Sequence, residues 1–169
     1  MPMKQLKVWG LAAFIALAAP AAFAQGAQVA FGGLQQDTSL PVEVTADQLQ
    51  VDQNTGRATF SGNVLIGQGE MRLSAAEVVV VYATEEEGGQ GKIAQLLASG
   101  GVTMVSGDEA AEAQAADYTI DTGIVIMTGG VILTQGPNAL SSEKLVINLK
   151  TGTGTMDGRV KSILQPGSN

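Results

Sequence analysis

Gly62-Asn63-Val64 is one of four copies of the most informative pattern in this chain, a glycine, then Asn, Gly or Arg, then Val. The other copies are Gly100-Gly101-Val102, Gly129-Gly130-Val131 and Gly158-Arg159-Val160, and the four valines lie 38, 29 and 29 residues apart. A small residue followed by an acid recurs between them, at Ala46-Asp47, Ala76-Glu77, Ala116-Asp117 and Ser142-Glu143. Such repetition indicates one supersecondary unit stacked on itself, since a single unit cannot bury its own apolar face. We interpret each glycine copy as a tight turn that opens a strand.

The chain from Pro41 onward predicts an all-β fold, because short alternating runs are broken by Gly, Asn and Asp at intervals of about eight to twelve residues. The Ala-rich stretch from Asp108 to Ala116 is interpreted as an irregular strand with a bulge. The expected strands are Val42–Thr45, Gln48–Asp52, Arg57–Ser61, Val64–Gln68, Glu70–Ser74, Glu77–Ala83, Lys92–Ala98, Val102–Ser106, Ala115–Asp121, Ile124–Thr128, Val131–Gln135, Lys144–Leu149 and Gly154–Leu164.

Alternation within these strands predicts a long sheet with one apolar face, because successive side chains of a strand point to opposite sides. Two interpretations of this face remain open: the core of a closed sandwich, or a partly open trough that holds acyl chains. The residues in the apolar phase include Val42, Val44, Leu49, Val64, Ile66, Leu73, Met104, Tyr118, Ile120 and Leu133.

The beginning of the chain has the layout of a secretory signal peptide. Lys4 and Lys7 precede an apolar run, and Ala22-Phe23-Ala24 is a small-x-small cleavage pattern, so residues 1–24 are expected to be removed; an uncleaved membrane anchor is the alternative. Removal takes two of nine basic residues and none of sixteen acids, which changes the net charge from −7 to −9. An acidic protein disfavours nucleic acid as a partner. We expect a flexible leader at 25–40, one domain at 41–164 and a short tail at 165–169.

The sequence predicts no enzyme. The chain contains no His and no Cys, which excludes Ser-His-Asp and Cys-His sites and the common zinc ligand sets. Glycine-rich stretches lack the remaining residues of phosphate-binding or calcium-binding loops. Paired carboxylates, Asp117 with Asp121 or Asp47 with Asp52, are the candidates for glycoside chemistry. Each of them, however, recurs at a turn position of the repeat, where an acidic residue has a structural role. We therefore expect no catalytic residue, no metal and no cofactor.

Three stretches resemble the OstA-like domain family of periplasmic lipopolysaccharide-transport proteins: residues 41–49 (PVEVTADQL), 60–69 (FSGNVLIGQG) and 73–80 (LSAAEVVV). The resemblance runs from about Pro41 to Leu164. It implies an elongated, twisted β-jellyroll of repeated antiparallel strands, open at both ends. It also implies a periplasmic, non-catalytic protein that binds the acyl chains of lipid A in its groove.

The resemblance further implies partners and groove residues. Members of this family stack end to end and connect an inner-membrane export complex to an outer-membrane translocon. Val42, Val44, Met104, Tyr118 and Ile120 match groove-lining positions, and Leu49, Val64, Ile66, Leu73 and Leu133 share their phase.

The strands Val42–Thr45 and Gly154–Leu164 are the expected docking edges. The alternatives are a membrane-anchored OstA-like partner of the export complex, or a closed structural β-repeat protein without a ligand.

Overall fold

A computed structural model describes residues 27–30, 33–84 and 91–165, and this part of the chain is all-β. The predicted signal peptide and residues 166–169 of the tail lie outside it. No helix in the described residues is long and apolar enough to cross a membrane. The strands are β1 (Ala27–Ala30), β2 (Glu43–Thr45), β3 (Gln48–Asp52), β4 (Arg57–Gln68), β5 (Met71–Tyr82), β6 (Ile93–Ser106), β7 (Glu109–Thr119), β8 (Ile124–Gln135), β9 (Asn138–Asn148), β10 (Thr153–Asp157) and β11 (Lys161–Ile163).

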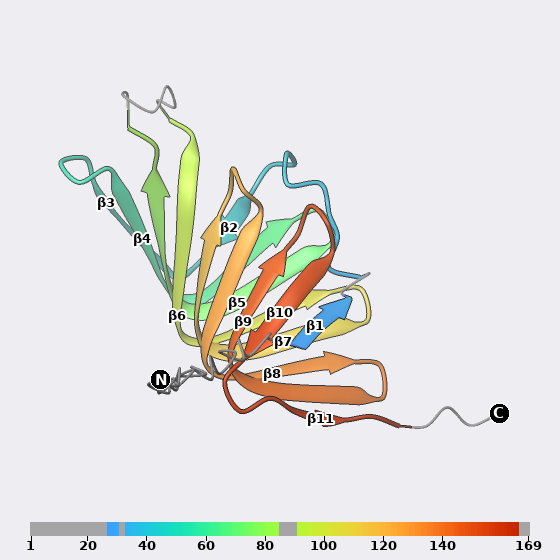
Figure 1. The fold of residues 1–169 in the computed structure, drawn as a ribbon. Helices are drawn as coiled ribbons and strands as arrows, with labels where there is room; N and C mark the ends of the chain where they lie inside the picture. The colour runs from blue at the N-terminus through green and yellow to red at the C-terminus, as the bar shows by residue number, and fades with distance from the viewer. Residues whose placement is uncertain (1–26, 31–32, 85–90, 166–169) are drawn as a thin grey trace, which may run out of the picture.

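These strands form one antiparallel sheet in the order β1-β10-β9-β8-β7-β6-β5-β4-β2 (Figure 1). Consecutive strands from β4 to β10 pair with each other, so the chain advances along the sheet hairpin by hairpin. Two short strands lie beside the ends of this path: β3 pairs with β4, and β11 pairs with β9.

The prediction that each glycine copy is a turn that opens a strand is wrong for the first three copies, which form bulges inside strands. β4, β6 and β8 each run through their copy, and the pairing register shifts there: between Ser61 and Val64, between Ser99 and Val102, and between Thr128 and Val131. Two residues on one strand then oppose one residue on its neighbour, which bends the strand and increases its twist. At the fourth copy the strand breaks, and Gly158-Arg159-Val160 separates β10 from β11.

The bulges are built from residues that tolerate positive φ. Gly100 and Gly101 have φ of 83° and 87°, and Asn63, with φ of 47°, is a residue type that tolerates this region. The recurring acidic residues face copies of the glycine pattern in two places: the backbone amide of Asp47 donates to Gly62 O at the β4 bulge, and that of Glu143 donates to Gly158 O at the break between β10 and β11. The two sequence patterns therefore pair with each other across the sheet.

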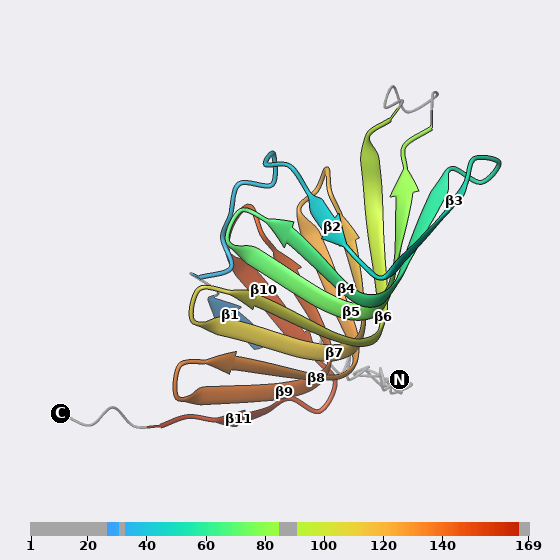
Figure 2. The ribbon, with the colours of Figure 1, turned by 180° about the vertical axis from the view of Figure 1, so that it is seen from behind.

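The line of bulges folds the sheet into a V of two walls, seen from both sides in Figures 1 and 2. Each long strand contributes one half to each wall. Wall 1 contains β1, β3, β10 and residues 57–61, 77–82, 93–99, 115–119, 124–128 and 144–148. Wall 2 contains β2, β11 and residues 64–68, 71–75, 102–106, 109–113, 131–135 and 138–142. This is the all-β fold that the sequence pattern predicts and the β-jellyroll that the family resemblance implies.

The unpaired edges differ from the expected ones at one end. β2 is an edge strand, as predicted from Val42–Thr45, and β3 is the corresponding edge of wall 1. At the other end β10 is paired on both sides, with β9 and with β1, so the edges are β1 and β11. The expected single strand Gly154–Leu164 is thus two strands in different walls.

Residues 33–42, which we call the strap, connect β1 on wall 1 with β2 on wall 2 across the mouth of the V (Figures 1 and 2). The sequence analysis placed most of this segment in a flexible leader. Instead, β1 pairs with β10, Leu34 is fully buried, and Gln36 N donates to Leu149 O over 2.9 Å. The leader therefore continues the fold at residues 27–30 and 33–40.

Candidate functional site

The space between the two walls is a continuous apolar interior. Opposite residues of antiparallel neighbours share a face, so the pairing aligns inner side chains in rows along the sheet. One row of wall 1 is Phe60, Val78, Ala98, Ala116, Met127, Leu145 and Met156, and the next is Ala58, Val80, Leu96, Tyr118, Val125 and Ile147. Wall 2 adds Val64, Ile66, Met71, Leu73, Val102, Met104, Ala111, Val131, Leu133 and Leu140. Leu34, at the mouth, belongs to the same cluster.

Nine of the ten residues predicted from the sequence belong to this interior. Val64, Ile66, Leu73, Met104, Tyr118 and Leu133 are buried, and Val42, Val44 and Ile120 are half-buried and pack against them. Leu49 is the exception, with 56% of its surface exposed. Their common location follows from strand alternation, since all of them occupy the inward phase.

Leu49 marks the end at which the interior opens. It pairs with Phe60, which pairs with Val78, and Val51 pairs with Ala58, so both β3 residues continue inner rows. Val51 is 59% exposed. The apolar rows therefore run out to solvent at the β2/β3 end of the sheet.

One polar link crosses the interior. Tyr118 of wall 1 donates its hydroxyl to Gln68 Oε1 of wall 2 over 2.8 Å, and both side chains are 1% exposed. Burial raises the pKa of Tyr118 to about 12, while the hydrogen bond with Gln68 acts in the opposite sense. The phenol therefore stays neutral at physiological pH. This link ties the two walls together.

Three of the four carboxylates considered for glycoside chemistry, those of Asp47, Asp52 and Asp117, have structural partners. Asp47 Oδ2 accepts a hydrogen bond from Asn63 Nδ2, and Asp117 accepts one from Gln95 Nε2. The backbone amide of Asn54 and the hydroxyl of Thr55 hold the pKa of Asp52 below its usual range. Within the described residues no cluster of three or more Asp, Glu, His or Cys side chains could hold a metal ion.

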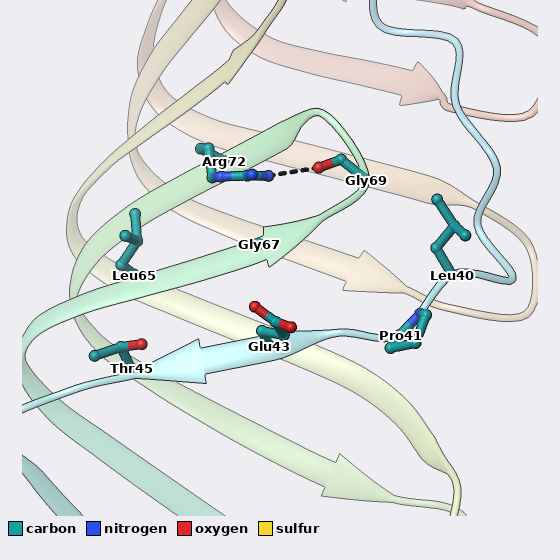
Figure 3. Close-up of a pocket in the computed structure, with 8 residues that line it drawn as sticks. All are labelled: Leu40, Pro41, Glu43, Thr45, Leu65, Gly67, Gly69 and Arg72. Atoms are coloured by element: carbon teal, nitrogen blue, oxygen red, sulfur yellow. Dashed lines mark hydrogen bonds between the residues drawn. The ribbon is translucent and has the colours of Figure 1, made fainter.

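A hollow of about 380 Å³ lies on the outer side of wall 2, beside the edge strand β2 (Figure 3). Its lining includes Glu43 and Thr45 from β2, Leu65 from β4 and Arg72 from β5. Arg72 Nη1 donates to the carbonyl oxygens of Gly69 and Met71 at 2.6 and 2.7 Å. The guanidinium is thus held by backbone at the turn between β4 and β5, close to the edge strand β2, which pairs only with β4.

The family of this chain is decided by residues 43–153, which match the family model of the LptA/(LptD N-terminal domain) LPS transport proteins. The chain belongs to this LPS transport protein family. The matched residues begin with β2 and end at the start of β10, so they contain most of both walls and all three internal bulges.

Individual proteins are also similar in sequence to this chain. The chain is 29% identical over 170 residues to uncharacterized protein R00383 of Rhizobium meliloti, covering 96% of this chain and 90% of that protein. It is 28% identical over 121 residues to the lipopolysaccharide export system protein LptA of Escherichia coli K12, covering 68% of this chain and 63% of LptA. The match thus spans less than two thirds of LptA.

The fold is also that of a solved structure. LptH, described as the LptA homologous periplasmic component of the lipopolysaccharide transport device of Pseudomonas aeruginosa, superposes with a TM-score of 0.68. The sequences are 18% identical, and the superposition covers 77% of this chain and 99% of LptH.

Sequence analysis missed two residues that shape the interior. Gln68 follows Val64 and Ile66 in the inward phase, so its polar side chain at an inner position was a signal that it needed buried partners. Leu34 lies outside the alternating strands, in a Gly- and Gln-rich stretch, and nothing in the sequence around it indicates burial.

Proposed function

We propose that this chain is a periplasmic carrier of lipopolysaccharide that holds the acyl chains of lipid A between its two walls. The observation that carries the proposal is the apolar interior, lined from both walls and continuing onto Leu49 and Val51 at the β2/β3 end. Membership of an LPS transport family and the names of LptA and LptH support the same cargo. The predicted signal peptide supports export to the periplasm.

Burial of acyl chains supplies the driving force for binding. Both lipopolysaccharide and the mature chain, with a net charge of −9, are anionic, so long-range electrostatics does not attract the cargo. Each methylene group moved from water into an apolar site contributes about 0.8 kcal/mol. The interior provides aliphatic surface, while the headgroup stays outside on a surface that repels it. We propose no catalytic step.

The unpaired ends support transfer between carriers. Edge strands present unpaired N–H and C=O groups that another strand can extend. β2 and β3 each have one unpaired edge at one end of the sheet, and β1 and β11 each have one at the other end. Copies stacked end to end through these edges would align their interiors. We propose that such stacks, together with related domains of the export complex and the outer-membrane translocon, form the bridge along which lipopolysaccharide moves.

A second candidate function has one observation in its favour. Interior side chains such as Val131 and Leu145 are fully buried among other protein side chains, as they would be in a closed structural β-repeat protein. Such a protein would bind no lipopolysaccharide.

Native mass spectrometry of the chain from residue 25, incubated with purified lipopolysaccharide, distinguishes the two candidates. Val44→Asp places a charge in the half-buried inner phase of β2, while Thr45→Asp places the same charge on the exposed face of the same strand. A buried unpaired charge is costly, so we expect Val44→Asp to abolish the complex and Thr45→Asp to retain it. Absence of binding by the unmodified chain would support the structural protein instead.

A further inference from the structure

The strap joins both rims of the V by hydrogen bonds. On wall 1, Gln36 N donates to Leu149 O, and Gln35 Nε2 donates to Lys150 O over 3.1 Å. On wall 2, Ser106 Oγ donates to Gly33 O over 2.7 Å. The strap therefore closes the mouth between the rims.

Leu34 is the apolar part of this closure. Its neighbours in sequence are fixed to opposite rims, Gly33 to wall 2 and Gln36 to both walls, since Gln36 Nε2 also contacts Met71 Sδ at 3.4 Å. Leu34 itself is fully buried in the same cluster as the interior residues of both walls. A side chain of the strap thus occupies apolar space that an acyl chain would otherwise enter.

Gln68 connects the strap with the link between the walls. Its Nε2 donates to Thr38 O and Leu40 O at 3.0 and 2.9 Å, while its Oε1 accepts from Tyr118. One buried amide therefore holds the strap, wall 1 and wall 2. Release of the strap removes two of these three hydrogen bonds, so the opening of the mouth is coupled to the contact between the walls.

Two buried oxygen atoms where the strap meets the walls lack hydrogen bonds to the described residues. Gln36 Oε1 and Glu109 Oε2 are buried and have no hydrogen-bond partner in the described structure. Glu109 lies directly under the strap, because a Cβ atom added to Gly33 would meet its Cγ at 3.4 Å. Unpaired buried oxygens disfavour the closed arrangement, since both regain water when the strap leaves.

We propose that the strap is a lid whose residue Leu34 competes with acyl chains for the interior, so that the strap must detach before lipopolysaccharide binds. This inference rests on the proposed function and adds a gate to the same site. Lipid binding and strap binding exclude each other, and occupancy of the interior by lipid leaves the strap exposed.

A disulfide lock tests this lid. The chain contains no cysteine, so Gly33→Cys together with Glu109→Cys introduces one defined pair that fastens the strap next to Leu34. The matched control is Glu109→Cys with Gln135→Cys, because Glu109 and Gln135 are opposite residues of β7 and β8 in wall 2 and the strap stays free. Association with purified lipopolysaccharide is measured for each protein, oxidised and then reduced with dithiothreitol.

We expect the oxidised lock to associate with lipopolysaccharide at least tenfold more slowly than its reduced form, and the control to be unaffected by oxidation. Equal rates for the locked and reduced strap, or equal slowing of the control, would overturn the lid while leaving the proposed function intact. A failure of the unmodified chain to bind would overturn the proposed function, and the lid with it.

Hydrogen exchange gives a second measurement that needs no substitution. On saturation with lipopolysaccharide, amide exchange in residues 33–40 should accelerate at least tenfold, because the bond from Gln36 N to Leu149 O opens. Exchange in residues 64–68 should not accelerate. Unchanged or slower exchange in residues 33–40 with lipid bound would contradict the lid.

Discussion

At the scale of single residues, the two glycines of the β6 bulge differ in what surrounds them. Both have positive φ, which costs an L-residue roughly 1–2 kcal/mol. A Cβ on Gly100 would lie 2.6 Å from the Cβ of Ala76 on β5, whereas a Cβ on Gly101 would meet no atom within 4 Å. The first position is therefore restricted by both conformation and space, and the second by conformation alone.

Alanine substitutions separate these two effects. We expect Gly101→Ala to lower the free energy of unfolding by roughly 1–2 kcal/mol, and Gly100→Ala to lower it by about 1–3 kcal/mol more, because β5 must move to relieve the clash. Urea denaturation of both variants checks this difference. Equal decreases in the free energy of unfolding for the two variants would show that the close approach of Gly100 to Ala76 does not constrain the β6 bulge.

At the scale of elements, the sequence predicted the strands better than their connections. Alternation located the inward phase correctly from Val42 to Leu133, because each strand buries one face and a shift by one residue would expose it. The glycine pattern was interpreted as turns, since consecutive residues with positive φ suit a hairpin turn as well as a bulge. Only pairing with residues distant in sequence, such as Ala76 opposite the β4 bulge, decides that the strand continues.

The strap shows the same limit of sequence reasoning. Its residues have no alternation, and its burial depends on two rims that are assembled from segments distant in sequence, such as Ser106 and Leu149. Leu49 shows the reverse case: its phase was predicted correctly, but its exposure was not, because β3 lies at the edge of the sheet, where the rows run out to solvent.

Tyr118→Phe tests the bond between β7 and β4. At neutral pH we expect it to lower the free energy of unfolding by about 1–3 kcal/mol, because Gln68 Oε1 loses its buried donor. The wild-type protein should lose a further part of its free energy of unfolding, which the variant does not lose, between pH 10 and about 12. In this range an unfolded tyrosine has lost its proton and the folded Tyr118 retains it.

This pH-dependent loss in the free energy of unfolding can reach about 2–3 kcal/mol and should be absent from Tyr118→Phe. Urea denaturation of both proteins across this range measures it. Parallel stability curves for wild type and Tyr118→Phe would show that the phenol is not held neutral by the interior.

At the scale of the whole molecule, a row of bulges turns one sheet into a container. The same long strands contribute to both walls, so the interior is continuous from the exposed Leu49 and Val51 to the β1/β11 end, and the strap covers its mouth. The interior is filled by the side chains of both walls. Acyl chains held there, as we propose, would replace contacts among these side chains.

The measurement that tests this account most directly is photocross-linking of lipopolysaccharide from the two faces of the sheet. A benzoylphenylalanine at Phe60 lies on the half-buried inner face near the open end, and one at Ile132, which is 48% exposed, lies on the outer face of wall 2. If acyl chains lie between the walls, position 60 gives a cross-linked lipid and position 132 gives none. Equal cross-linking from both positions, or cross-linking from position 132 alone, would contradict this placement of the acyl chains.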